Sequence, residues 1–307
     1  MESVDSRDLL GLEGLAAAEI QGILEHARSL KAGCRGDELA GRVIANLFFE
    51  NSTRTRCSFE VAAIRLGAHP LNLTASGSSA AKGESLVDTA NNIEAMGVDA
   101  LVVRTSVSGG AALVARSSAV PVINAGDGRH EHPTQALLDL FVLQERLGAL
   151  QGKRIAIVGD IINSRVARSN IHGLCALGAS VVLVGPPALV DTTFESRLSE
   201  PGAGSVEVTH DFDEVLEAAD AVMMLRIQRE RAAGGVIATD YRRLYGLTAQ
   251  RAARMRPEQV LLHPGPVNRG VEMDGSVLDD RERNVVLEQV AAGVLVRKAV
   301  LMRAIPA

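Results

Sequence analysis

The stretch FFENSTRTRCSFE, at residues 48–60, places cations where a helix does not favour them. Arg54 and Arg56 fall in the predicted first turn of a helix, whose unpaired N–H groups already carry roughly half a positive charge. Cations at such a helix end lose about 0.3–1 kcal/mol instead of gaining it. The stretch is therefore either a tolerated local imperfection or an anion site.

Further polar residues follow other strands of the same predicted sheet. Arg104 ends one strand, and His132 and Gln135 follow the next. Since ligands bind at the carboxyl ends of strands in open α/β sheets, we expect these groups to converge. Hydroxyls, main-chain N–H groups and guanidiniums suit a tetrahedral anion, and phosphate is the natural candidate. The expected cradle is Ser52, Thr53, Arg54, Thr55 and Arg104.

Each of these residues also has a purely structural interpretation. Asn51 or Ser52 could be a helix N-cap followed by solvated arginines. His132, which precedes Pro133, could equally be an N-cap or a partly buried histidine. Arg104 alone is more often a charge at a strand end than a ligand. The convergence of several strand ends favours the anion site.

Arg56 lies one residue deeper than the ligand positions, and we expect it to pair with Glu60 on its own helix face.

The loop ASGSSAAKGE, at residues 75–84, contains Lys82 as its only cation. Loops of small residues are usually solvated connectors. The alternative is a mobile lid that brings Ser78 and Lys82 to an anion after it has bound.

The second half of the chain offers another set of polar strand ends. They comprise Arg165, then Arg226 and Gln228, then HPGP at residues 263–266. Two separated arginines and an amide suit a dicarboxylate, because the planar guanidinium binds carboxylates with two hydrogen bonds. The remaining arginines of this half are better explained as helix-surface charges: Arg168, Arg229 and Arg231.

Composition limits the class of protein. A chain of 307 residues with a net charge of −5 and few charged residues suits a two-domain enzyme without a nucleic-acid-binding face. We find no signal peptide and no membrane-length apolar run, so we expect a cytoplasmic protein with no membrane partner. The three cysteines show no metal-binding or disulfide pattern. IAIVGDIINSRVARS, from residue 155, lacks G-x-G-x-x-G, and we expect no cofactor and no metal.

Apolar runs alternate with helical patterns, which is typical of an α/β protein with doubly wound parallel sheets. In the first half we expect a helix near residues 13–31, strands near 43–49, 69–74, 100–104 and 120–124, and a helix over 133–147. In the second half we expect strands near 155–160, 181–186, 206–210, 221–225 and 259–266. The closing stretch, NVVLEQVAAGVLVRKAVLMRAI, is apolar on more than one face and should be buried.

Taken together, these segments resemble the aspartate and ornithine carbamoyltransferase family over nearly the whole chain. The matching motifs occur in the family's order: STRTR at 52–56, SFE at 58–60, KGES at 82–85, DT at 88–89, HPTQ at 132–135, SRVARS at 164–169, RIQ at 226–228 and HPGPVNRG at 263–270. The resemblance implies transfer of a carbamoyl group from carbamoyl phosphate to an amino acid.

The resemblance also implies a domain organisation and an assembly. Residues 1–132 would form a carbamoyl phosphate-binding domain of four to five strands, 133–150 a linking helix and 151–283 an aspartate-binding domain. The C-terminal helix, at about residues 284–307, would return to the first domain. The implied assembly is a homotrimer with shared active sites, in which Ser78 and Lys82 reach into the neighbouring subunit's site. Regulatory chains or a dihydroorotase are further candidate partners.

Site roles follow from the resemblance residue by residue. Phosphate is assigned to the cradle residues, and the carbamoyl oxygen to Thr55, Arg104 and His132. Gln135 and the carbonyl of Pro266 lie near the carbamoyl amino group. As catalytic residues we expect Arg54, Thr55, Arg104 and His132. As carbamoyl phosphate ligands we expect Ser52, Thr53, Arg54, Thr55, Arg104, His132, Gln135, Pro266 and, from the neighbour, Ser78 and Lys82. The aspartate ligands are Lys82, Arg165, Arg226, Gln228, Gly265 and Pro266.

Two departures and two rivals accompany this assignment. Thr105-Ser106 replaces a His-Pro pair frequent in the family, and Asn163 replaces a histidine.

An ornithine enzyme typically carries His-Cys-Leu-Pro in place of HPGP, and Arg226 and Lys82 would repel the ornithine ammonium group. We therefore expect aspartate, and with it a role in pyrimidine biosynthesis. The second rival is a non-catalytic assembly subunit, which has no need for this full set of ligands.

Overall fold

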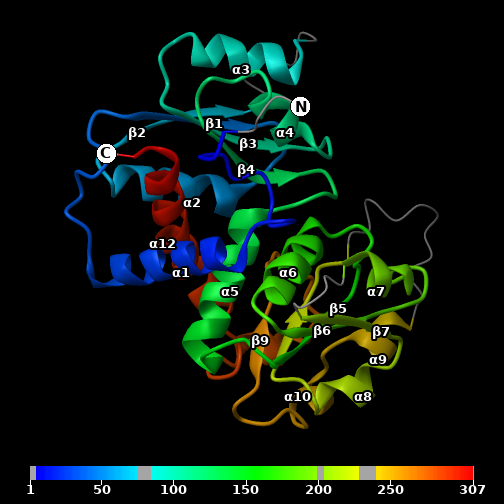
Figure 1. Ribbon diagram of the computed structural model, residues 1–307. Coiled ribbons are helices and arrows are strands. Elements are labelled where there is room, and N and C mark those ends of the chain that lie inside the picture. Colours follow the sequence, from blue (N-terminus) through cyan, green and yellow to red (C-terminus); the bar gives the residue numbers. More distant parts are fainter. Residues whose placement is uncertain (1–4, 75–83, 199–203, 228–239, 307) are drawn as a thin grey trace. The chain divides into compact units, whose positions relative to one another are not determined.

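The computed structural model describes residues 5–74, 84–198, 204–227 and 240–306 (Figure 1). The chain divides into two compact units, the first made of residues 1–138 and 290–307 and the second of residues 139–289. Within the described ranges, no helix has the length and apolarity that crossing a membrane requires. Ser78, Lys82 and Gln228 lie outside the described residues.

The first unit is built on a four-stranded parallel sheet in the order β2-β1-β3-β4. Its strands are β1 (Val43–Phe48), β2 (His69–Thr74), β3 (Ala100–Thr105) and β4 (Val122–Asp127). β1, β3 and β4 are almost entirely buried, as is usual for parallel strands with both faces covered. β2, at the edge, is mostly exposed.

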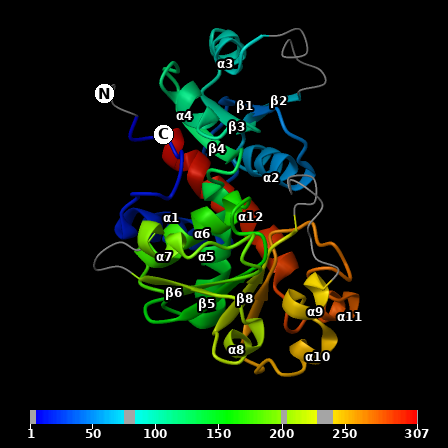
Figure 2. The ribbon, with the colours of Figure 1, turned by 90° about the vertical axis from the view of Figure 1, so that its right-hand side faces the viewer.

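Helices cover both faces of this sheet (Figures 1 and 2). α3 (Leu86–Glu94) and α4 (Gly110–Ala115) lie on one face, where Ile93 and Val114 share a core with Leu101 and Val103. α2 (Thr53–Ile64) and α12 (Val286–Ala304) lie on the other. α1 (Ala17–Ser29), followed by the 3-10 turn η1 (Leu30–Ala32), is tied to α12 by the ion pair between Glu19 and Arg303.

The buried Arg297 side chain anchors α12 to α2. Its guanidinium donates to the Ser58 hydroxyl at 2.9 Å and lies over the Phe59 ring, 5.1 Å from the ring centre. The predicted return of the C-terminal helix to the first domain is confirmed, since residues 290–307 belong to the first unit.

The second unit contains a five-stranded parallel sheet in the order β7-β6-β5-β8-β9. The strands are β5 (Arg154–Val158), β6 (Ser180–Val184), β7 (Ser205–Thr209), β8 (Ala221–Met224) and β9 (Val260–Leu262). One core packs Val158 and Val222 of the sheet against Phe212. The helices are α6 (Arg165–Ala176), α7 (Thr193–Leu198), α8 (Phe212–Leu216), α9 (Tyr241–Tyr245), α10 (Ala249–Ala252) and α11 (Gly275–Asp279). α5 (Pro133–Leu147) contains the boundary between the units after Leu138.

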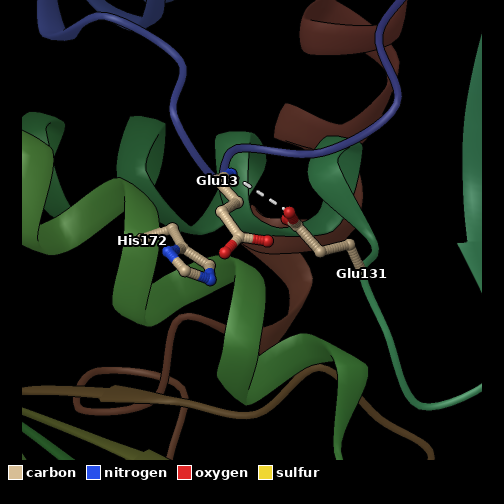
Figure 3. A group of neighbouring side chains, drawn as sticks. All are labelled: Glu13, Glu131 and His172. Atoms are coloured by element: carbon tan, nitrogen blue, oxygen red, sulfur yellow. Dashed lines mark hydrogen bonds between the residues drawn. The ribbon is translucent and has the colours of Figure 1, made fainter. Parts of the chain in front are cut away.

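The predicted fold class is confirmed, with three element boundaries corrected. The strand expected over 259–266 is shorter, because β9 ends at Leu262 and HPGP follows as a loop. β4 runs to Asp127 instead of ending near residue 124, because its polar end stays buried through hydrogen bonds among its own side chains. The first helix starts at Ala17 and not near residue 13. The Glu131 carboxylate accepts the N–H of Glu13 at 3.0 Å (Figure 3) and that of Leu12 at 2.8 Å, so these two N–H groups have partners outside a helix. His172, drawn there too, belongs to α6 of the second unit.

Candidate active site

The N-terminus of α2 is not closed by its N-cap side chain, unlike those of α3 and α6. Ser52 occupies the N-cap position in extended conformation, yet its hydroxyl makes no capping hydrogen bond. By contrast, the Ser85 hydroxyl accepts the N–H of Asp88 at 3.0 Å, and the Ser164 hydroxyl that of Ala167 at 3.1 Å. The first N–H groups of a helix have no partner within it. The turn at 52–55 thus offers its hydroxyl and N–H groups to an external acceptor.

Arg54 extends from this turn as a cation without a protein counterion among the described residues. The residue is exposed as a whole, but surrounding protein desolvates its guanidinium enough to lower the pKa of Arg54. It remains charged, since an arginine pKa is far above neutrality. The expected ion pair between Arg56 and Glu60 is wrong, because these two described residues form none. A desolvated cation at a positive helix end calls for an anion.

Arg104 lies beside the segment that leads into this turn because β3 pairs with β1. The register aligns Arg104 with Phe48, and the N–H of Phe49 donates to the Arg104 carbonyl at 2.8 Å. The Arg104 guanidinium donates to the Ala125 carbonyl at 3.1 Å and lies 3.6 Å from the Glu50 carboxylate. Sequence reasoning missed Glu50, although an acid between a strand and a cationic turn was a usable signal.

His132 immediately precedes α5 and is buried. The two structural interpretations of this residue, a helix N-cap and a buried histidine, therefore hold together. Its carbonyl accepts the N–H groups of Gln135 at 3.0 Å and Ala136 at 3.2 Å, which starts the helix. Gln135 is half-buried in the first turn of α5.

The strand order brings these residues to one edge of the first sheet. β1, β3 and β4 are neighbours, and their carboxyl ends lead to the 52–55 turn, to Arg104 and to the loop before His132 (Figure 1). Thr105, the first residue of the expected departure at 105–106, is held at this edge by two hydrogen bonds. The N–H of Gly128 donates to the Thr105 carbonyl at 2.9 Å, and the Thr105 hydroxyl accepts the N–H of Val107 at 3.2 Å.

In the second unit, Arg165 is the first residue of α6 and is buried. The loop before it is shaped by Asp160, whose carboxylate accepts both the main-chain N–H of Asn163, at 3.2 Å, and its amide, at 2.9 Å. Asn163 therefore has a structural role in this loop. Arg168 lies over the Phe194 ring, 5.5 Å from its centre.

The other second-unit candidates follow β8 and β9, which pair with each other. Arg226 is half-buried two residues after β8. After β9, the N–H of Gly265 donates to Nδ1 of the buried His263 at 2.7 Å, and the N–H of His263 donates to Gln289 at 3.0 Å. This places Gly265 and Pro266 at the carboxyl edge of the second sheet, beside the end of the strand that leads to Arg226.

Within the described part of either unit alone, no trio of His, Cys, Asp or Glu side chains is arranged to hold a metal ion.

Fold and site together define a class: a two-unit α/β protein with hydroxyls and arginines at the strand edge of one unit and further arginines at the strand edge of the other. The sequence matches two family models, "Aspartate/ornithine carbamoyltransferase, carbamoyl-P binding domain" over residues 7–145 and "Aspartate/ornithine carbamoyltransferase, Asp/Orn binding domain" over residues 151–304. The chain belongs to the aspartate/ornithine carbamoyltransferase family.

Two similar curated proteins are aspartate carbamoyltransferase catalytic subunits. The one from Rhodospirillum rubrum is 51% identical over 302 residues, covering 96% of this chain and 92% of that protein. The one from Myxococcus xanthus is 51% identical over 299 residues, covering 96% and 98%.

Solved structures show the same fold in both branches of the family. Aspartate transcarbamoylase from Trypanosoma cruzi, in complex with carbamoyl aspartate and phosphate, has a TM-score of 0.86 and 30% identity, covering 99% of this chain and 97% of that one. Ornithine carbamoyltransferase from Pyrococcus furiosus has a TM-score of 0.87 and 31% identity, covering 99% of each chain. The fold alone therefore does not separate aspartate from ornithine.

Proposed function

We propose that this chain transfers the carbamoyl group of carbamoyl phosphate to L-aspartate, giving N-carbamoyl-L-aspartate and phosphate, a step of pyrimidine biosynthesis. The observation that carries the proposal is the open N-terminus of α2. An uncapped Ser52 hydroxyl and the first N–H groups of the helix share one turn with Arg54, and the pairing of β3 with β1 brings Arg104 to the same edge of the sheet. Such a set of donors suits a phosphoryl group.

The second substrate is assigned by the second unit. Arg165 and Arg226 supply two cations at its strand edge, which suit the two carboxylates of aspartate and oppose the ammonium group of ornithine. The segment after β9 is HPGP, without the cysteine typical of ornithine enzymes. The similar aspartate carbamoyltransferase catalytic subunits at 51% identity support the same choice.

Catalysis requires no group beyond the two substrates and this chain's donors. The neutral amine of aspartate attacks the carbamoyl carbon and a tetrahedral intermediate forms. The C–O bond then breaks, and the departing phosphate takes the proton that the amine loses. Arg104, Thr55 and His132 would donate to the developing oxyanion, while the 52–55 turn and Arg54 receive the departing phosphate. Donors fixed before the reaction lower its barrier because they need no reorganisation as charge develops.

The proposed active form is a homotrimer in the cytoplasm, with Ser78 and Lys82 contributed by the neighbouring subunit. The edge strand β2 supports an assembly, since it leaves Leu71 exposed at 38% and the adjoining helix α2 leaves Ile64 exposed at 57%. Long exposed edge strands are usually covered in native proteins. Regulatory chains or a dihydroorotase are candidate additions to the trimer.

Product analysis tests the proposed reaction directly. Carbamoyl phosphate labelled with ¹³C is incubated with ¹⁵N-aspartate, and the product is followed by NMR together with released phosphate. The proposal predicts one phosphate released per carbon–nitrogen bond formed, with the ¹³C signal coupled to ¹⁵N. Binding of carbamoyl phosphate without bond formation would instead favour a non-catalytic assembly subunit.

A further inference from the structure

A single buried carboxylate, that of Asp127 at the end of β4, accepts four hydrogen bonds. One oxygen accepts the N–H of Gly109 at 2.7 Å and contacts Nδ1 of His130 at 3.1 Å. The other accepts the amide of Asn124 at 2.9 Å and the N–H of Glu131 at 3.0 Å. Burial alone would raise the pKa of Asp127, but these donors hold it below its ordinary value.

These partners belong to two different loops of the candidate active site. Gly109 ends the loop that follows Arg104 on β3, and Glu131 directly precedes His132. The loops also touch between Arg129 and Ser108, where the N–H of Arg129 donates to the hydroxyl at 3.0 Å. Gly128 permits this approach, since a Cβ there would lie 2.4 Å from the Ser108 hydroxyl oxygen. Asp127 is thus the charged link between the Arg104 side and the His132 side of the site.

Asp127 is only 1% exposed and has its lone pairs occupied by these four donors, so it is not placed to bind a substrate itself. We propose that Asp127 is a positioning residue, whose carboxylate fixes His132 relative to Arg104. The proposal rests on the function proposed above. A carboxylate is needed because it offers acceptors on both oxygens, whereas an asparagine would turn an NH₂ donor toward two of the existing donors and leave them unsatisfied.

The test compares Asp127→Asn with Asp99→Asn. Asp99 is a matched control because its carboxylate also accepts a main-chain N–H, that of Val43 at 2.8 Å, and pairs with Arg42. It lies at the amino ends of the strands, away from the candidate site. We expect Asp127→Asn to lower kcat by about 10- to 100-fold, the scale of a displaced catalytic group. Binding of inorganic phosphate, measured by calorimetry, should change by less than about threefold, because four of the five cradle residues lie in the 52–55 turn, which Asp127 does not contact.

A second readout separates positioning from general destabilisation. The imidazole signals of His132 are followed by NMR in histidine-labelled protein. They should shift in Asp127→Asn and stay in place in Asp99→Asn, even where the two variants lose the same amount of thermal stability. His130→Ala removes only the half-exposed partner of Asp127 and keeps its other three donors, so it should fold and lose kcat by about 3- to 10-fold.

The outcomes are distinguishable. Unchanged kcat and unchanged His132 signals in every variant that folds would overturn the positioning role, as would equal losses in Asp127→Asn and Asp99→Asn. No turnover by the wild-type chain would instead overturn the proposed reaction. The His132 signals would still decide whether Asp127 positions that side chain.

Discussion

At the residue scale, the two arginines that begin α2 have different environments. Neither arginine has a counterion among the described residues, but Arg54 lies in the first turn beside the uncapped Ser52 and surrounding protein desolvates its guanidinium, whereas Arg56 lies two residues further along the helix. We therefore assign the anion to Arg54.

We predict that Arg54→Ala lowers kcat by about 10²- to 10³-fold, because loss of one preorganised donor costs roughly 3 kcal/mol in the barrier. The oligomeric size, measured by light scattering, should not change. Arg56→Ala is the matched control and should stay within about threefold of wild type. Equal losses in the two variants would contradict the assignment.

A second residue-scale prediction concerns His130. The hydrogen bond to Asp127 raises the pKa of His130, burial opposes this shift, and the charges of Asp127, Glu131 and Glu13 support it. Because the folded-state pKa lies above the unfolded value, the pair stabilises the fold fully below about pH 6.5, and this contribution disappears as pH rises through the folded-state pKa.

The expected contribution is on the order of 0.5 kcal/mol, since the His130 side chain is 41% exposed and solvent screens the pair. Urea unfolding of wild type and His130→Ala should differ at about pH 5.5 and converge at about pH 8.5. A difference that is the same at both values would show that ionisation of His130 plays no part.

At the element scale, the function proposed above assigns the N-terminus of α2 to ligand binding instead of helix capping. Ser52 does not cap α2, whereas Ser85 caps α3. We predict that Ser52→Ala leaves the free energy of unfolding within about 0.5 kcal/mol of wild type, while Ser85→Ala lowers it by about 1 kcal/mol. Calorimetry should show weaker carbamoyl phosphate binding in Ser52→Ala. Equal destabilisation by both substitutions would mean that the Ser52 hydroxyl serves the helix.

Much of the fold is predictable from the sequence because it depends on local patterns. Buried parallel strands give continuous apolar runs such as VIANLF, and Pro133 in the first turn fixes the start of α5. The ends of apolar runs also identify Arg104 and Arg226 as candidate site residues, since ligands bind at the carboxyl ends of parallel strands.

The remainder depends on contacts between distant residues. Glu131 holds the N–H groups of Leu12 and Glu13, which delays the first helix, and no local pattern predicts a partner more than a hundred positions away. The links of Glu50 to Arg104 and of Asp127 to Gly109 likewise require the strand order, which brings β3 between β1 and β4. Buried carboxylates of this kind are recognised only once their donors are known.

At the scale of the whole molecule, the proposed trimer is tested by mixing two inactive variants. Arg54→Ala and Lys82→Ala trimers are dissociated, combined in equal amounts and reassembled. If each site takes Arg54 from one subunit and Lys82 from its neighbour, about a quarter of the sites should recover both residues. Activity that stays at the level of the separate variants would indicate sites formed within single subunits.

The most direct test of the central claim is phosphate release from carbamoyl phosphate with aspartate and with ornithine, measured side by side on the wild-type protein. The arrangement of Arg165 and Arg226 predicts turnover with aspartate and none above background with ornithine. Turnover with ornithine alone would contradict the assignment of the second substrate.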